Sequence, residues 1–335
     1  MIKDLVKKFL YEFGWLSHLH RKRNKSVLTV VLFHRVFPIS DERYAQADME
    51  WTVTDVFFKD CLQFFKQHYN VIDLGQLQQF IEQGTALPDY PLLITFDDGW
   101  LDNLEYALPL TQQHNIRPLL FVTTSAIGKP MLSWQEILYS AWRVDRLSDE
   151  TVKKLAAIIQ QPLAAIKAES DIRNLIQTIQ HCAEHVRMQA AEIIYTIALP
   201  SPVQMLNREQ LNQLAKGFDF GTHGVRHEHL TQSKNPRAEL HQAREQLQAL
   251  TGQALTLCKS YPHGRHNDEV MQMAKEVGYT MIFTGIRCHT QLKQKSHAIF
   301  GRHNMNQLMY QSSNGRLRPE LLAMYLFRQP IQELY

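Results

Sequence analysis

Short apolar runs alternate with segments of helical periodicity along most of the chain. Runs typical of buried strands occupy residues 27–34, 92–97, 118–123, 218–223, 257–261 and 279–284. Between them, apolar residues recur at helical spacing over residues 55–69, 76–83, 101–114, 236–250 and 268–276. Pro109 lies inside the third of these helices, where a proline can kink the chain. This alternation predicts an α/β fold with a parallel sheet or barrel.

Two segments interrupt the alternation. Residues 133–216 carry long helical patterns and almost no strand signal, which predicts a helical subdomain inserted between strands. Residues 319–335 are predicted to be mostly helical. The expected organisation is an N-terminal helix over 1–25, a barrel over 26–310 with the insertion at about 133–216, and a C-terminal helical segment over 311–335.

Residues 1–25 predict a basic amphipathic helix. The basic residues outnumber Asp4 and Glu12, and they are Lys3, Lys7, Lys8, Arg21, Lys22, Arg23 and Lys25. Such a helix either caps the domain or lies on an anionic membrane surface. The segment lacks the uninterrupted apolar core of a secretory signal, and no apolar run approaches the ~20 residues of a membrane span. We therefore expect a cytoplasmic protein, with peripheral membrane contact through residues 1–25 as the alternative.

The composition is that of a folded protein with a sizeable core. The chain has 335 residues, of which 44% are hydrophobic and 21% charged, and its net charge of +3 gives no indication of a nucleic-acid partner. Cys61, Cys182, Cys258 and Cys288 are scattered without metal-ribbon or disulfide spacing. Reduced thiols are consistent with a cytosolic location.

The strand ending in Asp97 and Asp98 offers the clearest chemistry. Two adjacent carboxylates follow the run Leu92–Phe96, and functional groups gather where buried parallel strands end. Burying two anions costs free energy unless a cation or a proton compensates them. A metal ion is therefore predicted, with one carboxylate binding it and the other handling a proton. The alternative is an ordinary strand followed by an Asp-Gly turn.

A histidine pair completes a candidate metal site. His223 and His227 lie four residues apart, which places them on one face if the segment turns as a helix. Two imidazoles and an aspartate make a three-ligand site with open positions, which suits metal-assisted hydrolysis. His229, offset by two residues from His227, is expected to point away on the surface.

These residues resemble the motifs of the polysaccharide deacetylase family, the NodB-homology enzymes of carbohydrate esterase family 4. Thr95–Gly99 is similar to the first motif, His223-xxx-His227 to the second, and Tyr261-Pro262-His263-Gly264 to the third. The resemblance implies a distorted (β/α)7-type barrel that removes N-acetyl groups from a saccharide. It also implies Asp97 as catalytic base, and Asp98, His223 and His227 as ligands of one divalent metal ion, most often Zn2+, although other first-row ions suit these ligands.

The third motif departs from the family pattern. Ser260 stands where the family often has an arginine that orients the base, and His263 replaces a tyrosine. Arg35 or Arg302 is the hypothetical substitute for that arginine. A backbone N–H near His263, beside Tyr261, remains available as an oxyanion donor.

The catalytic acid is expected at the start of the barrel. The late Leu-x-His motif of most members has no clean match, and His297 and His303 fit it poorly. Leu32–Val36 instead resembles the opening of a permuted branch that includes poly-N-acetylglucosamine deacetylases, which implies His34 as the acid, with His303 as the alternative. Trp100 adjoins the site and is a hypothetical sugar-stacking residue.

The expected function is metal-dependent N-deacetylation of a glycan or glycan precursor during surface-polysaccharide (exopolysaccharide) biosynthesis. Two alternatives stay open. One is a carbohydrate-binding or scaffolding member without full activity, which the changes at Ser260 and His263 would allow. The other is a hydrolase of a non-sugar amide C–N bond.

Overall fold

The structure is a computed structural model that describes residues 2–131, 133–162, 166–201, 204–252, 254, 257–293 and 298–334. The chain divides into two compact units. The first comprises Met1–Pro38, Met49–Gly128 and Leu206–Tyr335, and the second comprises Ile39–Asp48 and Lys129–Met205.

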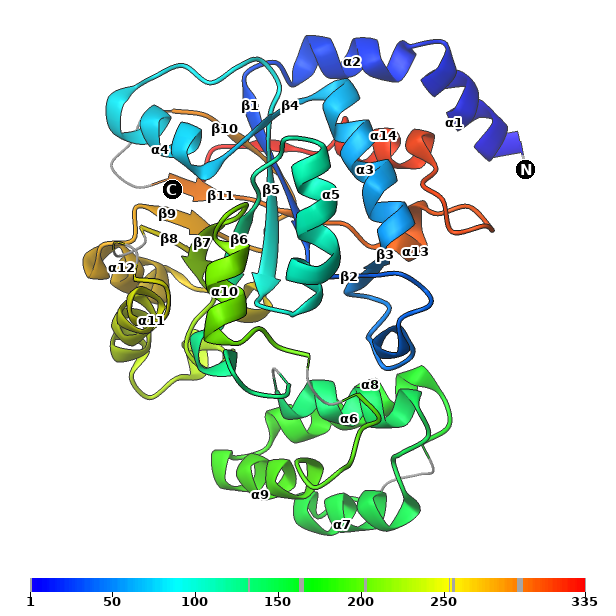
Figure 1. Cartoon of the computed structure of the whole chain (residues 1–335), viewed down its shortest axis with the longest axis vertical. Coiled ribbons are helices and arrows are strands. Elements are labelled where there is room, and N and C mark those ends of the chain that lie inside the picture. Colours follow the sequence, from blue (N-terminus) through cyan, green and yellow to red (C-terminus); the bar gives the residue numbers. More distant parts are fainter. Residues whose placement is uncertain are drawn as a thin grey trace. The chain divides into compact units, whose positions relative to one another are not determined.

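The first unit is built on one large, mostly parallel sheet (Figure 1). Its strand order is β11-β9-β8-β7-β6-β5-β1-β10-β13, with β12 also paired to β1 and β4 to β5. Only the β1–β10 pairing is antiparallel among these described strands. The strands are β1 (Val27–Phe33), β4 (Asn70–Ile72), β5 (Pro91–Asp98), β6 (Leu119–Val122), β7 (Asp219–Thr222), β8 (Cys258–Ser260), β9 (Met281–Phe283), β10 (His289–Gln291), β11 (Ala298–Phe300), β12 (His303–Asn304) and β13 (Ile331–Gln332). This distorted barrel confirms the α/β prediction.

Helices and one small parallel pair surround the sheet. The pair is β2 (Arg35–Phe37) with β3 (Thr52–Thr54). The helices of this unit are α1 (Ile2–Glu12), α2 (Trp15–Arg23), α3 (Asp55–His68), α4 (Leu74–Gln83), α5 (Leu108–Gln113), α10 (Arg208–Leu214), α11 (Pro236–Thr251), α12 (Asp268–Val277), α13 (Gln307–Tyr310) and α14 (Pro319–Leu326). Within the described residues, no helix has both the length and the apolar character needed to cross a bilayer.

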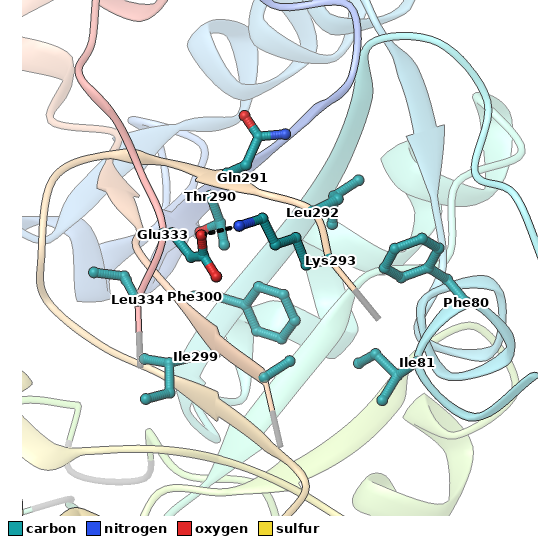
Figure 2. Close-up of a pocket in the computed structure, with 11 residues that line it drawn as sticks. Phe80, Ile81, Thr290, Gln291, Leu292, Lys293, Ile299, Phe300, Glu333 and Leu334 are labelled. Atoms are coloured by element: carbon teal, nitrogen blue, oxygen red, sulfur yellow. Dashed lines mark hydrogen bonds and ion pairs between the residues drawn. The ribbon is translucent and has the colours of Figure 1, made fainter. Parts of the chain in front are cut away.

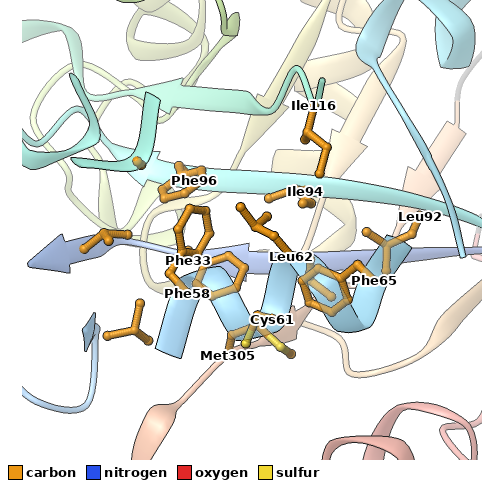
Figure 3. Packing of buried hydrophobic residues seen from close by; sticks show 14 of the residues in the cluster. Phe33, Phe58, Cys61, Leu62, Phe65, Leu92, Ile94, Phe96, Ile116 and Met305 are labelled. Atoms are coloured by element: carbon orange, nitrogen blue, oxygen red, sulfur yellow. The ribbon is translucent and has the colours of Figure 1, made fainter. Parts of the chain in front are cut away.

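Strand alternation separates two apolar layers. Phe33 on β1 and Phe96 on β5 face outward and pack against Phe58 and Phe65 of α3 (Figure 3). Alternate positions on the same two strands, such as Leu93 of β5, belong instead to an inner cluster with residues of β6, β8 and β9. The outer layer therefore holds the helices to the sheet, and the inner layer fills the barrel.

Gly221 shows how tightly the barrel interior is packed. A Cβ atom placed there would lie 2.6 Å from Phe121 and 2.8 Å from the sulfur of Cys258, closer than real side chains approach. Only glycine fits at this position of β7, and the inward-facing position two residues later is His223.

The second unit is helical and has its own core. It contains α6 (Trp134–Arg143), α7 (Asp149–Ile159), α8 (Glu169–His181) and α9 (Glu184–Ile194). Leu138, Leu155, Ile172 and Ile194 are buried in its apolar cluster. Arg173 of α8 binds both oxygens of Asp48, at 2.8 and 3.1 Å, and this ties Ile39–Asp48 to the helices.

One local prediction is wrong. The C-terminal segment is not helical throughout, because α14 ends at Leu326 and residues 331–332 pair with β10 as β13. Pro109 lies in α5 directly after the π-helix η2 (Asn103–Ala107), which continues into α5, so the irregular turn comes just before the proline that cannot donate a backbone hydrogen bond. The kink at Pro109 stays a prediction.

Candidate metal centre and active site

The end of β5 places two carboxylates on the inner side of the barrel. Asp97 has the same strand parity as Leu93, so it points inward and is 2% exposed. Asp98 would point outward, but its φ of +83° turns the backbone out of the strand conformation. A positive φ is unusual for aspartate and often marks a functional site. Both carboxylates therefore lie within 3.6 Å of the Nε2 atom of His223.

His223 and His227 reach the site from a loop, so the prediction of a helical turn is wrong. Gly224 and His227 both have positive φ, +81° and +56°, which no α-helix allows. The carboxylate of Glu239 on α11 fixes the loop by accepting hydrogen bonds from the N–H groups of Val225 and Arg226, at 2.8 and 3.1 Å. The loop still brings the two rings together, with centroids 5.1 Å apart.

Asp98, His223 and His227 form a group of potential metal ligands. One ligand atom from each lies within 4.8 Å of the other two. The Oδ1 atom of Asp98 is 3.6 Å from Nε2 of His223 and 3.3 Å from Nε2 of His227. A tetrahedral zinc ion with ligands at ~2.1 Å would separate its ligand atoms by about 3.4 Å. The donor set therefore fits a divalent ion in both chemistry and spacing.

Neighbouring groups orient these ligands. Nδ1 of His223 lies 3.3 Å from the carbonyl oxygen of Ser260 and must donate to it, which leaves Nε2 free of a proton. The indole N–H of Trp100 donates to Oδ2 of Asp98 at 2.9 Å, so Oδ1 is the oxygen turned to the histidines. Burial lowers the pKa of His223 to about 3, which keeps the imidazole neutral, the form that binds metal.

Asp97 is held in place by Arg302. The guanidinium donates to both carboxylate oxygens, at 2.7 and 2.9 Å, and both side chains are buried. The same guanidinium donates to Oγ of Ser260 at 2.5 Å. Burial alone would raise the pKa of Asp97, but Arg302 and His223 outweigh it and hold the pKa below its usual value. Asp97 is therefore a carboxylate at neutral pH, the form a general base requires.

His34 and His303 lie on opposite sides of the sheet. His34 follows Phe33, so strand parity turns it inward, and both Asp97 and Arg302 act on its pKa. Burial lowers that pKa to about 4. His303 pairs with outward-facing Val31 and is fully buried, its ring 5.7 Å from that of Tyr325 on α14. This contradicts the alternative in which His303 is the acid, and His297 lies outside the described residues.

Two other residues that the sequence suggested for the site, Arg35 and Trp100, are buried and contact each other. Arg35 is buried against Asp102, with Nη2 3.0 Å from Oδ2, and its guanidinium lies 4.0 Å from the Trp100 ring centroid. It does not replace the missing family arginine, because Arg302 binds Asp97. The indole of Trp100 is 2% exposed, so it has no free face for a sugar, which contradicts the stacking hypothesis.

In the third motif, the side chain of Tyr261 is buried, whereas that of His263 lies beside two other histidines. The ring of Tyr261 is fully buried under Nζ of Lys259, at 3.2 Å, so only its backbone can face a substrate. His263 has a φ of +56° and lies with its ring 4.5 Å from His227 and 4.4 Å from His229. His229 is therefore stacked beside the metal group and does not point away, because no helix separates the two faces.

Three buried residues near the site carry no sequence signal of their own. Asp102 accepts from the N–H of Val36 at 2.8 Å as well as from Arg35, and Glu239 holds the histidine loop. Lys259 is 1% exposed, on the helix-facing side of β8. A lone Asp, Glu or Lys reads as a surface residue in a sequence, because burial depends on contacts between distant segments.

A separate pocket contains none of these residues. Phe80 and Ile81 of α4 line one wall, and Thr290, Phe300 and the Lys293–Glu333 ion pair line others (Figure 2). No side chain proposed for catalysis or metal binding reaches it, so it is not the candidate active site.

Comparisons with known proteins agree with this geometry. The family model for polysaccharide deacetylases matches residues 85–282, which contain Asp97, Asp98, His223 and His227. A search of curated proteins finds no match.

Several solved structures share the fold. The deacetylase PplD of Streptococcus pyogenes, solved in complex with acetate, is 16% identical with a TM-score of 0.56, covering 90% of this chain and 99% of that one. IcaB of Ammonifex degensii is 14% identical with a TM-score of 0.54, covering 90% and 97%. A polysaccharide deacetylase of Bacillus cereus is 13% identical with a TM-score of 0.52, covering 84% and 65%. At these identities the likeness concerns the fold. Because the family model spans more than half of the sequence, the chain belongs to the polysaccharide deacetylase family and is a carbohydrate N-deacetylase.

Proposed function

We propose that this enzyme is a metal-dependent hydrolase of the acetamide group of an N-acetylated saccharide. The observation that supports this most is the arrangement at the end of β5. Ligand atoms of Asp98, His223 and His227 converge, and the carboxylate of Asp97, held by Arg302, lies beside them. A base next to a three-ligand metal group is an arrangement suited to the hydrolysis of an amide by water.

Asp98, His223 and His227 are the proposed metal ligands. A divalent ion held there would polarise the acetamide carbonyl and lower the pKa of a water molecule toward neutrality. The neutral imidazoles and single carboxylate leave a net positive charge on the occupied group. Zinc is the proposed ion, since two nitrogens and one oxygen are common zinc ligands.

Asp97 is the proposed general base. Its carboxylate is ionised at neutral pH and takes a proton from the attacking water, while Arg302 keeps both oxygens in a fixed orientation. Backbone N–H groups of the Tyr261–His263 segment are the proposed donors to the oxyanion of the tetrahedral intermediate. A backbone donor would survive the replacement of tyrosine by His263.

His34 is the proposed acid. The C–N bond breaks only if the nitrogen receives a proton, because an amide anion is too basic to leave. With a pKa of about 4 in the free protein, His34 is neutral before the reaction, and the proton that it passes to the nitrogen is the one that Asp97 removes from water. The products are acetate and the free amino sugar, which accounts for every atom of the amide and the water.

Trp51 is the proposed contact for a sugar ring. Its ring centroid is 4.8 Å from that of His34, and its side chain is 38% exposed, unlike the buried Trp100. An exposed indole beside the proposed acid offers an apolar face to a pyranose ring. A glycan or glycan precursor of surface-polysaccharide biosynthesis is the proposed substrate.

Acetate release tests this function directly. Purified protein is incubated with N-acetylglucosamine oligomers before chelation, after chelation, and after Zn2+ is restored. We expect activity to disappear with the chelator and to return with the ion, and Asp97→Asn to stay inactive in all three conditions. Chelator-resistant release would contradict metal dependence. Release from simple N-acetyl amines but not from saccharides would favour the non-sugar amide alternative, and no release from any amide would favour a binding role.

A further inference from the structure

Helices α1 and α2 leave an unusual apolar surface exposed. Leu5, Val6 and Phe9 on α1, Phe13 in the turn after it, and Trp15 on α2 have side chains between 51% and 73% exposed, and the rings of Phe9 and Phe13 lie 4.1 Å apart. We call these five residues the N-terminal apolar surface. At about 100° per residue, Leu5 and Phe9 lie about 40° apart around α1, and Phe13 follows one residue after the end of that helix. Single exposed apolar side chains are normal, but five on consecutive turns are not.

This surface does not hold the two helices to the barrel. The opposite side does so, since Leu10 and Tyr11 pack against the outer core layer and Leu16 is fully buried in it. His20 stacks on Phe327, with centroids 4.2 Å apart, and Asn24 donates to the carbonyl oxygen of the same residue. Figure 1 shows α1 and α2 beside α14, which both helices contact. Docking therefore leaves the N-terminal apolar surface free for another partner.

The same segment is rich in basic side chains. Lys8, Arg21, Lys22 and Lys25 are exposed on or just after the same two helices. Residues 1–25 contain seven Lys and Arg against two Asp and Glu, a net charge of +5 for the segment, whereas the whole chain carries only +3. Aromatic side chains with flanking lysines and arginines suit the boundary between headgroups and acyl chains.

We propose that the N-terminal apolar surface docks on a bilayer containing anionic phospholipids. The apolar side chains enter the headgroup boundary, and the basic residues bind the negative lipid headgroups. A protein partner would not require a net positive charge on the segment that carries the apolar side chains, whereas binding to an anionic bilayer does. The docking holds the enzyme at a membrane without a spanning helix and does not depend on the proposed function.

Vesicle co-sedimentation of the full chain tests the proposal. Vesicles of phosphatidylcholine alone are compared with vesicles that also contain phosphatidylglycerol. We expect binding to the second kind only, weakening as salt is raised because the charges are screened. The double variant Phe9→Glu/Phe13→Glu should lower the partition coefficient at least about tenfold, since two aromatic rings no longer leave water.

A matched variant controls for the loss of any exposed apolar residue. Leu308 and Met309 on α13 are 60% and 58% exposed and belong to the same unit. Leu308→Glu/Met309→Glu should bind vesicles as the parent does, and circular dichroism melts should show that both variants fold. Equal binding by both double variants, or no preference for anionic vesicles, would overturn the proposal. So would a dimer in light scattering that only Phe9→Glu/Phe13→Glu dissolves, because a second copy would then cover the surface.

Discussion

Replacing Arg302 by methionine tests whether this arginine keeps the proposed base, Asp97, in its ionised form. The side chain loses two hydrogen bonds to Asp97, at 2.7 and 2.9 Å, and the positive charge that faces it. Methionine keeps much of the length and fills the same apolar surroundings, which include the ring of Phe121 5.5 Å from the guanidinium. The variant therefore removes the charge while disturbing the packing little.

The size of the effect follows from the burial of the pair. Both side chains are 3% exposed, and removing one partner of such a pair costs about 3–5 kcal/mol if the other stays charged. Asp97 can avoid that cost by binding a proton. At 1.36 kcal/mol per unit, the same free energy corresponds to a pKa rise of about 2–4 units. Burial, which already acts to raise the pKa, would then no longer be outweighed.

The pH dependence of acetate release reveals this rise. Only the carboxylate form of Asp97 accepts a proton, so a higher pKa removes activity from the acidic side first. We expect the acidic limb of kcat/KM to move up by about 2–4 units in Arg302→Met. Arg302→Lys should show a smaller shift of the acidic limb, because lysine keeps the positive charge but cannot form the bidentate hydrogen bonds of a guanidinium. Metal content should stay at the parent level, since Arg302 contacts none of the three ligands.

An unchanged pH profile in a folded, metal-loaded Arg302→Met protein would refute the reasoning. It would mean either that Asp97 is not the base or that another cation compensates it. Lys259 can be tested in the same assay, because Asp97 acts to raise its pKa against the larger lowering by burial.

The remaining predictions concern other groups of the fold. Asp97→Asn should lose acetate release while elemental analysis still finds metal, and His227→Ala should lose the metal itself. His34→Gln should lower kcat at least about a hundredfold with little change in KM, as for a general acid, whereas His303→Gln should act on the melting temperature and leave kcat largely unchanged. Burial lowers the pKa of His20 to about 4. Neutral His20 therefore makes its full contribution to the free energy of unfolding above pH 6.5, and this contribution is lost as the pH falls toward 4. His20→Gln should therefore flatten the pH dependence of the unfolding free energy by about 3 kcal/mol, measured by urea denaturation between pH 7 and pH 4; an unchanged slope would contradict this.

Long apolar patterns predicted the central strands and helices well. β1 and β5 are seven and eight buried residues long, and most of their residues are apolar, with Thr29 in β1 and Thr95, Asp97 and Asp98 in β5 as the exceptions. β10, β11, β12 and β13 were missed because they are only two or three residues long and lack the longer strand-like runs in which the equally short β8 and β9 lie. Such short segments acquire strand geometry from their neighbours, and no periodicity can be read from so few residues.

The histidine loop shows a different limit. The spacing of His223 and His227 suggested a helical face, and the rings do meet, but through a loop with positive φ at Gly224 and His227. Sequence spacing constrains how far apart two side chains are, and several backbone paths satisfy the same distance. The anchor that selects this path, Glu239, lies on another element and gives no local signal.

Ser260 and Arg302 show what a sequence motif can and cannot specify. A buried Asp97 needs a cation nearby, and this electrostatic requirement fixes the charge but not the strand that supplies it. The small Ser260 leaves space beside Asp97, and Arg302 fills that space. Arg302 donates to Oγ of Ser260 and, across 205 residues of sequence, to both oxygens of Asp97. Arg35 was the other candidate for this role, but it binds Asp102 and lies over the ring of Trp100. The resemblance to the family therefore implied that an arginine orients the base, and only the tertiary structure could decide which one.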